Sequence, residues 1–241
     1  MRRAAWAWAA GAVLLVLGMV WATARQPHRV VDFRLKGEGW RGVPGVAVVP
    51  RVEGKLPVVI YLHGSGDALE RSTGTLRQFA ELGIAAVYMD YTQTNAASFP
   101  AEFEALCSWV ASQAWAETNR VAWVGFSLGA QRMLTYLLAE PARAPKFLVR
   151  LGGGTVPELA KAQSGQLTLP VWLLHGGEDQ AFPLAELRQT EMDLRRVGAG
   201  VTTTVLPGQT HAFGESRALV HRLIAERCRS ELAAGRHASS P

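Results

Sequence analysis

The chain has 241 residues, of which 49% are hydrophobic and 19% are charged. A chain of this size and composition can bury a full core in one domain, and it is too apolar to be fully disordered. The formal net charge is +5, but Arg2 and Arg3 supply two of the positive charges, and no dense cluster of lysine and arginine follows them. Nucleic acid is therefore not an expected partner, because proteins that bind it concentrate basic residues on one face.

The first segment of the chain predicts export. Arg2 and Arg3 precede residues 4–24, which contain no charged residue. Residues 22–24, Ala-Thr-Ala, fit the small-residue cleavage site of a signal peptide. The run is also long enough to cross the hydrocarbon core of a bilayer once, with tryptophans toward both ends. Two interpretations of residues 1–24 stay open, a cleaved signal peptide and a single membrane anchor, and both predict a periplasmic or secreted domain.

Residues 25–233 are predicted to form one domain in which strands and helices alternate. Residues 234–241 are predicted to form a flexible tail. Continuous β-branched and apolar runs indicate strands that are covered on both faces. The predicted strands span residues 30–35, 45–49, 57–62, 84–89, 120–124, 147–151, 171–174 and 201–206. Apolar residues at helical spacing predict helices between most of these strands. The predicted helices span residues 70–82, a segment that Ser98 caps, and residues 128–139, 183–197 and 215–232.

This alternation predicts an α/β fold, a three-layer sandwich with a mostly parallel central sheet. No helical segment separates the first two strands, so they are predicted to pair antiparallel at one edge, with Gly42, Pro44 and Gly45 in the turn.

Cys107 and Cys228 are interpreted as small buried residues of two helices, although an exported domain would also allow a disulfide between them. The residues of the last helix that are predicted to face inward are Val220, Leu223, Ile224 and Cys228.

The sequence Gly-Phe-Ser-Leu-Gly at residues 125–129 stands between a predicted buried strand and a predicted helix. In this G-x-S-x-G context a serine sits on a sharp strand-to-helix turn that exposes its hydroxyl for nucleophilic attack. Glycines two residues to either side relieve the crowding of such a turn. Ser127 is therefore predicted to be the nucleophile of a serine hydrolase, rather than a serine that only caps a helix. The N–H group of Leu128 is predicted to donate to the oxyanion.

Three motifs together resemble the α/β-hydrolase superfamily, and within it the dienelactone-hydrolase-like branch. They are residues 125–129, Leu-His-Gly-Gly-Glu-Asp at residues 174–179, and Gly-Gln-Thr-His-Ala-Phe at residues 208–213. With the alternating elements, the resemblance extends over residues 45–230. It implies the α/β-hydrolase fold, ester hydrolysis, and neither a metal nor an organic cofactor. Dienelactone hydrolases proper use a cysteine nucleophile, so Ser127 favours a general ester hydrolase over their particular substrate.

His211 is predicted to be the general base, because it follows the last predicted strand and the chain order is Ser…Asp…His. The base needs a carboxylate that orients its ring and stabilises the imidazolium. The pattern of glycine, two residues and aspartate in the family that the chain resembles favours Asp179 over its neighbour Glu178. Asp90 is a weaker candidate, because it precedes Ser127 in the chain.

The loop His-Gly-Ser-Gly at residues 63–66 follows a predicted buried strand and resembles the His-Gly-x loop of many members of the superfamily. This resemblance implies that the N–H group of Ser65 is the second oxyanion donor beside Leu128. A glycine-rich loop also suits phosphate binding, but no P-loop lysine follows it, so a nucleotide site is not expected.

These observations predict an exported carboxylesterase that acts on small esters through an acyl-serine intermediate. Residues 152–169 lie where this fold inserts its lids, and so short a segment predicts a minimal lid and an open site. Two alternatives remain open: an amide or peptide hydrolase that uses the same triad, and a non-catalytic exported binding protein on a hydrolase scaffold. The aromatic candidates for the wall of an acyl pocket are Tyr91, Phe126, Phe182 and Phe213, and a place in the core is the alternative for each of them.

Overall fold

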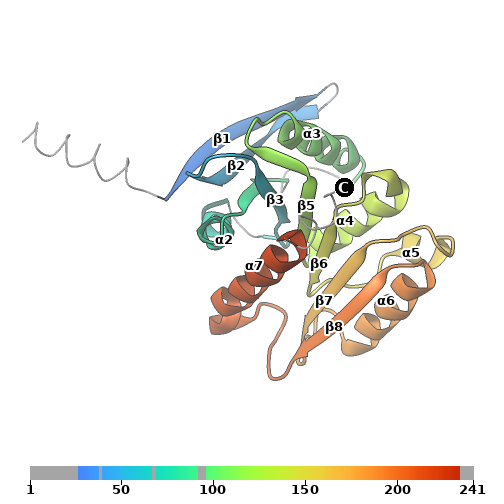
Figure 1. The fold of residues 1–241 in the computed structure, drawn as a ribbon. Coiled ribbons are helices and arrows are strands. Elements are labelled where there is room, and N and C mark those ends of the chain that lie inside the picture. The colour runs from blue at the N-terminus through green and yellow to red at the C-terminus, as the bar shows by residue number, and fades with distance from the viewer. Residues whose placement is uncertain (1–26, 38–39, 67–68, 92–95, 234–241) are drawn as a thin grey trace, which may run out of the picture.

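The computed structural model describes residues 27–37, 40–66, 69–91 and 96–233, which form one eight-stranded sheet with helices on both faces (Figure 1). The strands are β1 (His28–Gly37), β2 (Trp40–Pro50), β3 (Leu56–Leu62), β4 (Ala85–Met89), β5 (Ala116–Phe126), β6 (Phe147–Leu151), β7 (Pro170–Gly176) and β8 (Gly200–Leu206). The helices are α2 (Leu69–Glu81), α3 (Phe99–Ala111), α4 (Leu128–Ala139), α5 (Pro157–Lys161), α6 (Leu184–Arg196) and α7 (Arg217–Ala233), with short 3₁₀ turns η1 (Pro141–Arg143) and η2 (Gly214–Ser216). The predictions for residues 1–24 and 234–241 lie outside the described residues, within which no helix is long and apolar enough to cross a membrane.

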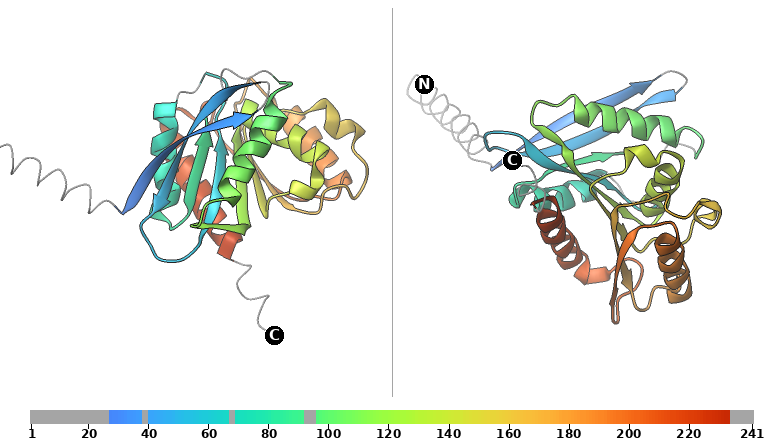
Figure 2. Two further views of the ribbon diagram at one scale, coloured as in Figure 1. Left: turned by 90° about the horizontal axis from the view of Figure 1, so that it is seen from above. Right: turned by 45° about the vertical axis from the view of Figure 1, so that its right-hand side comes forward.

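The central strands run parallel, as the alternation of strands and helices predicts. The strand order is β1-β2-β4-β3-β5-β6-β7-β8, and β3 to β8 pair parallel throughout. Helices α3, α4 and α6 cover one apolar cluster, and α2 and α7 cover a second cluster on the opposite face (Figure 2). Burial on both faces explains why these strands are continuous apolar runs. Since parallel strands all end at one edge, the loops after β3, β5, β7 and β8 meet there.

The antiparallel edge is confirmed, but its turn is not where the glycines and proline predict it. β1 and β2 pair antiparallel along most of their length, and Gly42, Pro44 and Gly45 lie inside β2. Gly45 also pairs with Met89 of β4, and a Cβ atom at Gly45 would lie 2.3 Å from the Phe33 ring. The glycine is therefore explained by close packing within a strand, which glycine permits, and not by a turn.

The last helix differs from prediction at one position. Three of the four residues predicted to face inward are buried, but Leu223 is 40% exposed. His221 on the same helix is buried, and its Nδ1 atom lies 3.0 Å from Thr75 Oγ1 of α2. Helix α7 packs against α2 as well as against the sheet. Its buried face therefore includes His221, and Leu223 lies outside that face.

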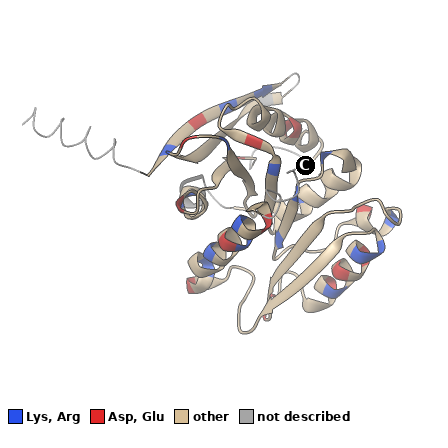
Figure 3. Cartoon of the chain, viewed as in Figure 1, with Lys and Arg blue, Asp and Glu red and all other residues tan. Residues whose placement is uncertain are grey.

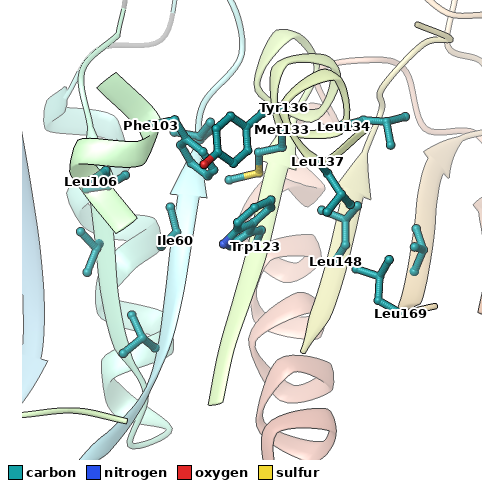
Figure 4. Packing of buried hydrophobic residues seen from close by; sticks show 14 of the residues in the cluster. Ile60, Phe103, Leu106, Trp123, Met133, Leu134, Tyr136, Leu137, Leu148 and Leu169 are labelled. Carbon is teal, nitrogen blue, oxygen red and sulfur yellow. The ribbon is translucent and has the colours of Figure 1, made fainter. Parts of the chain in front are cut away.

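Aromatic packing holds α4 against the sheet (Figure 4). The Phe103 ring of α3 lies 4.9 Å from the Trp123 ring of β5 and 4.9 Å from the Tyr136 ring of α4, edge to face in both cases. Each pair of this kind stabilises the fold by roughly 0.5–1.5 kcal/mol beyond the burial of its area. The cluster therefore fixes α4 relative to β5, and with them the turn that joins these two elements.

Two further features match their predictions. Residues 152–169 contain only the five-residue helix α5, which is the minimal lid expected from the length of this segment. Cys107 and Cys228 are free and belong to clusters on opposite faces of the sheet, so no disulfide joins them; Cys228 is buried as predicted, whereas Cys107 is only partly buried. Burial, with a smaller contribution from Glu104, raises the pKa of the Cys107 thiol to about 12.

Charged residues of both signs are interspersed along α6 and α7 (Figure 3). Arg195 pairs with Glu191 at 2.7 Å in α6, and Arg222 pairs with Glu226 at 3.0 Å in α7. Exposed pairs one helical turn apart contribute about 0.3–0.5 kcal/mol each. These two helices therefore present mixed charge and no uniformly basic face in this view.

Candidate active site

Ser127 stands on the sharp turn between β5 and α4, with φ 52° and ψ −117°. Such a conformation is strained for a residue with a side chain. A Cβ atom at Gly125 would lie 2.6 Å from the Ala130 backbone, and one at Gly129 would lie 2.5 Å from the Leu62 carbonyl oxygen. The two glycines that flank the serine are therefore needed for this turn to form between the strand and the helix.

Ser127, His211 and Asp179 form one chain of hydrogen bonds. The Ser127 hydroxyl donates to His211 Nε2 over 3.0 Å, and His211 Nδ1–H donates to Asp179 Oδ2 over 2.8 Å. The Asp179 side chain is fully buried, and the His211 side chain is 26% exposed. This arrangement requires the Nδ1–H tautomer of neutral His211, which leaves Nε2 free to accept a proton from serine.

The loop after β7 fixes the Asp179 carboxylate. The N–H groups of Ala181 and Phe182 both donate to Asp179 Oδ1 over 2.9 Å, which leaves Oδ2 for His211. Glu178 is exposed, and its N–H group donates to the Gln209 carbonyl oxygen over 2.9 Å. The structure thus brings Asp179, and not its neighbour, to the histidine.

His175, which is not among the site residues predicted from the sequence, also contacts this carboxylate. Its Nε2–H donates to the Phe182 carbonyl oxygen over 2.7 Å and lies 3.4 Å from Asp179 Oδ2. Its side chain is 1% exposed. Gly152, with φ 55°, lies against His211 and Asp179, because a Cβ atom there would be 3.4 Å from His211 Nδ1 and 3.6 Å from Asp179 Oδ2. The signal for His175 was its place at the end of a buried strand, four residues before Asp179.

The predicted oxyanion donors belong to two segments of the chain that come close to the serine. Leu128 is the first residue of α4, where N–H groups have no partner within the helix. The loop at residues 63–66 passes beside the turn, because a Cβ atom at Gly64 would lie 3.2 Å from Ser127 Cβ. Ser65 is exposed at the tip of this loop. The roles of the Leu128 and Ser65 N–H groups remain predictions.

The four aromatic candidates fall into two groups. Phe126 stacks on the His211 ring with centroids 5.3 Å apart, and Phe182 meets the same ring edge-on at 5.4 Å. Tyr91 and Phe213 are each 1% exposed and belong to the core. Phe126 and Phe182 therefore shield the histidine, whereas the other two support the elements behind it.

Within the described ranges no three His, Cys, Asp or Glu side chains are arranged so that they could hold a metal ion. The assembled residues suit chemistry in which serine is the nucleophile and histidine carries the proton. The family model described as the dienelactone hydrolase family matches residues 69–231. The chain belongs to the dienelactone hydrolase family. The predicted resemblance is confirmed, and with it the assignment of the chain as a hydrolase.

Individual relatives agree with this assignment. Esterase YpfH of Escherichia coli (strain K12) is 31% identical over 96 residues, a match that spans 39% of this chain and 39% of that protein's length. Est1E from Butyrivibrio proteoclasticus has a TM-score of 0.70 at 15% identity, over 84% of this chain and 99% of that one. The dienelactone hydrolase from Anabaena variabilis ATCC 29413 has a TM-score of 0.68 at 18% identity, over 87% and 99%. The two structures confirm the predicted α/β-hydrolase fold.

Proposed function

We propose that the chain is a serine carboxylesterase whose catalytic residues are Ser127, His211 and Asp179. The observation that carries the proposal is the continuous hydrogen-bond chain from the Ser127 hydroxyl through His211 to the buried Asp179 carboxylate. Serine is a weak nucleophile at neutral pH, and an adjacent base that removes its proton activates it. A buried carboxylate holds the base in the required tautomer and stabilises the imidazolium.

The reaction proceeds in two halves. His211 Nε2 takes the Ser127 proton as Oγ attacks the ester carbonyl, and the N–H groups of Leu128 and Ser65 stabilise the oxyanion. The tetrahedral intermediate collapses to an acyl-serine, and the leaving alcohol receives the proton from His211. Water then attacks the acyl-serine with His211 again as base, and the acid is released while Ser127 regains its proton.

The preferred substrates in this proposal are small esters in solution. The segment between β6 and β7, which the structure describes throughout, contains only α5, so no cap domain is inserted there. Hydrolysis of amides or peptides by the same residues, and ligand binding without turnover, are the competing functions.

A labelling experiment tests the proposal. The full chain is treated with a fluorophosphonate and its intact mass is measured, with Ser127→Ala as the test variant and Ser164→Ala, an exposed loop serine, as the control. We expect one adduct on the unaltered chain and on the control, none on Ser127→Ala, and hydrolysis of p-nitrophenyl acetate in parallel. A folded chain that takes no label and cleaves no ester would overturn the proposal and favour a binding protein. Turnover of peptide amides without ester turnover would favour the amide hydrolase.

We also propose that the domain is exported. The support is the sequence alone, namely two arginines followed by the uncharged residues 4–24. Fractionation of cells that produce the chain with a C-terminal epitope tag tests this, and N-terminal sequencing distinguishes cleavage after Ala24 from retention. Recovery of the full-length chain in the cytosol would contradict export.

A further inference from the structure

A groove begins at the residue that follows the proposed nucleophile. It encloses about 330 Å³, which is within the range of small-molecule sites. Along its floor lie five residues of one α4 face: Leu128, Gln131, Arg132, Thr135 and Tyr136. The start of α3 forms one wall and the segment that leads into α5 forms the other; the wall residues are Ala96, Phe99, Pro100, Thr155, Val156, Pro157 and Glu158.

A larger cavity of about 440 Å³ does not compete for the substrate. It is lined by Thr118, Val121 and Lys146 among others, at the amino ends of β5 and β6. Ser127 lies at the carboxyl end of β5, where α/β sheets bind their ligands. Among the cavities of the described residues, the groove along α4 is the one whose lining includes a direct neighbour of Ser127.

The position of His211 decides which half of the ester the groove receives. The leaving alcohol must take a proton from His211 Nε2, so it has to lie on the histidine side of Ser127. The aromatic rings on that side, Phe126 and Phe182, do not line the groove, and neither does His211. The groove instead includes Leu128, whose N–H group is the predicted oxyanion donor next to the carbonyl that stays on Ser127.

The groove is elongated and largely apolar. From Leu128 to Tyr136 the helix advances eight residues, or roughly 12 Å at the usual rise. The rings and aliphatic groups of Phe99, Val156 and Pro157 face this length. An apolar groove of this length suits an extended hydrocarbon chain better than a compact or strongly hydrated group.

The two charged side chains of the groove favour an uncharged acyl chain as its ligand. The Arg132 guanidinium lies over the Phe99 ring at 5.1 Å and over the Tyr91 ring at 5.7 Å, so its charge is turned to the α3 wall. The Glu158 carboxylate accepts a long hydrogen bond of 3.4 Å from the Thr135 hydroxyl at the far part of the groove. A carboxylate at the end of an acyl chain would meet Glu158 there and be repelled.

We propose that this groove binds the acyl chain, and that the enzyme prefers esters of neutral, unbranched acids of medium length over acetate esters. This inference rests on the esterase activity proposed above and adds the acyl class to it. Each methylene that enters the groove leaves water, so catalytic efficiency rises with chain length until the groove is full. The gain appears mainly as a lower KM, because the chain is held in the substrate complex as well as in the transition state.

The test compares p-nitrophenyl octanoate with p-nitrophenyl acetate on the full chain. Thr135→Trp places an indole in the groove, and Met192→Trp, at an exposed position of α6, is the matched control. The readout is the ratio of kcat/KM for octanoate to that for acetate. This ratio does not depend on the fraction of folded enzyme, so partial misfolding of a variant does not mimic the effect.

We expect the unaltered chain to prefer octanoate at least tenfold, Met192→Trp to keep this ratio, and Thr135→Trp to lower it at least tenfold through KM. Glu158→Leu should raise the ratio by extending the apolar lining. If acetate is cleaved but the ratio is near one, or if Thr135→Trp leaves it unchanged, the groove does not bind the acyl chain although the esterase proposal stands. If neither ester is cleaved by the unaltered chain, the esterase proposal fails, and this inference fails with it.

Discussion

His175 Nε2 lies 3.4 Å from Asp179 Oδ2, the same carboxylate oxygen that accepts the His211 hydrogen bond. The His175 N–H group donates at the same time to the Phe182 carbonyl oxygen over 2.7 Å. The buried imidazole therefore joins the two ends of the loop that carries Asp179. We infer that His175 is a positioning residue that acts through Asp179 and does not touch the substrate.

His175→Ala should lower kcat by about 10- to 100-fold with little change in KM, because small displacements of a catalytic group cost rates of this order. His175→Gln should recover part of the loss, since its amide N–H can still donate to the Phe182 carbonyl oxygen. Steady-state kinetics with p-nitrophenyl esters measure both variants. Equal losses in the two variants, or a loss confined to KM, would argue against the positioning role.

Replacement of Ser127 should separate activity from stability. Ser127→Ala and Ser127→Gly should both lower kcat by roughly 10⁴-fold or more, because neither offers a nucleophile. The glycine variant should unfold with a free energy about 1 kcal/mol higher than the alanine variant, since φ 52° is strained for alanine and not for glycine. Urea denaturation measures this difference. Equal free energies of unfolding for the alanine and glycine variants would show that the turn is not strained.

The two neighbouring carboxylates after β7 should behave differently. Asp179→Asn should lower kcat by about 10³- to 10⁴-fold, because the amide no longer fixes the His211 tautomer or stabilises the imidazolium. Glu178→Gln is the matched control and should change kcat less than twofold, since this side chain is exposed and outside the hydrogen-bond chain. Kinetics of purified, folded variants decide the point. A large effect of Glu178→Gln would mean that the acid has been assigned to the wrong residue.

Two glycine-to-alanine changes should have opposite effects on stability. Gly129→Ala should be destabilising by about 2 kcal/mol or more, because its Cβ would lie 2.5 Å from the Leu62 carbonyl oxygen. Gly74→Ala, in the interior of α2 with nothing within 4 Å of the new Cβ, should be stabilising by about 0.5–1 kcal/mol. Thermal unfolding of both variants beside the unaltered chain tests this. The same sign for both would contradict the packing argument.

The cysteines should be unreactive in the folded protein. Burial raises the pKa of the Cys107 thiol to about 12 and raises the pKa of Cys228 further, so the reactive thiolate is scarce at neutral pH. A disulfide-exchange reagent at pH 7 should label neither residue in the native chain and both in guanidinium chloride. Labelling of native Cys107 should increase only as the pH approaches its raised pKa. Rapid labelling at pH 7 would show that the helix α3 opens more readily than its packing suggests.

The sequence by itself determined the alternating strands and helices, because the central strands are buried on both faces and each therefore reads as an unbroken apolar run. It also indicated Ser127, since the turn that carries it needs glycine at Gly125 and Gly129, and such local requirements are written in neighbouring residues. The order of Ser127, Asp179 and His211 along the chain was enough to predict three residues that the structure brings into one hydrogen-bond chain.

Only the tertiary structure decided the relations between residues that are distant in the chain. Gly45 resembled a turn residue until its neighbours in β1 and β4 were known, and the buried face of α7 depended on how that helix meets α2. The contacts of His175 with Phe182 and Asp179 exist only because the loop that carries Asp179 folds back onto the end of β7. The groove along α4 exists only because α3 and α5 flank that helix. Local patterns record strand, helix and turn, whereas side-chain contacts and cavities are set by packing between elements that the sequence does not place side by side.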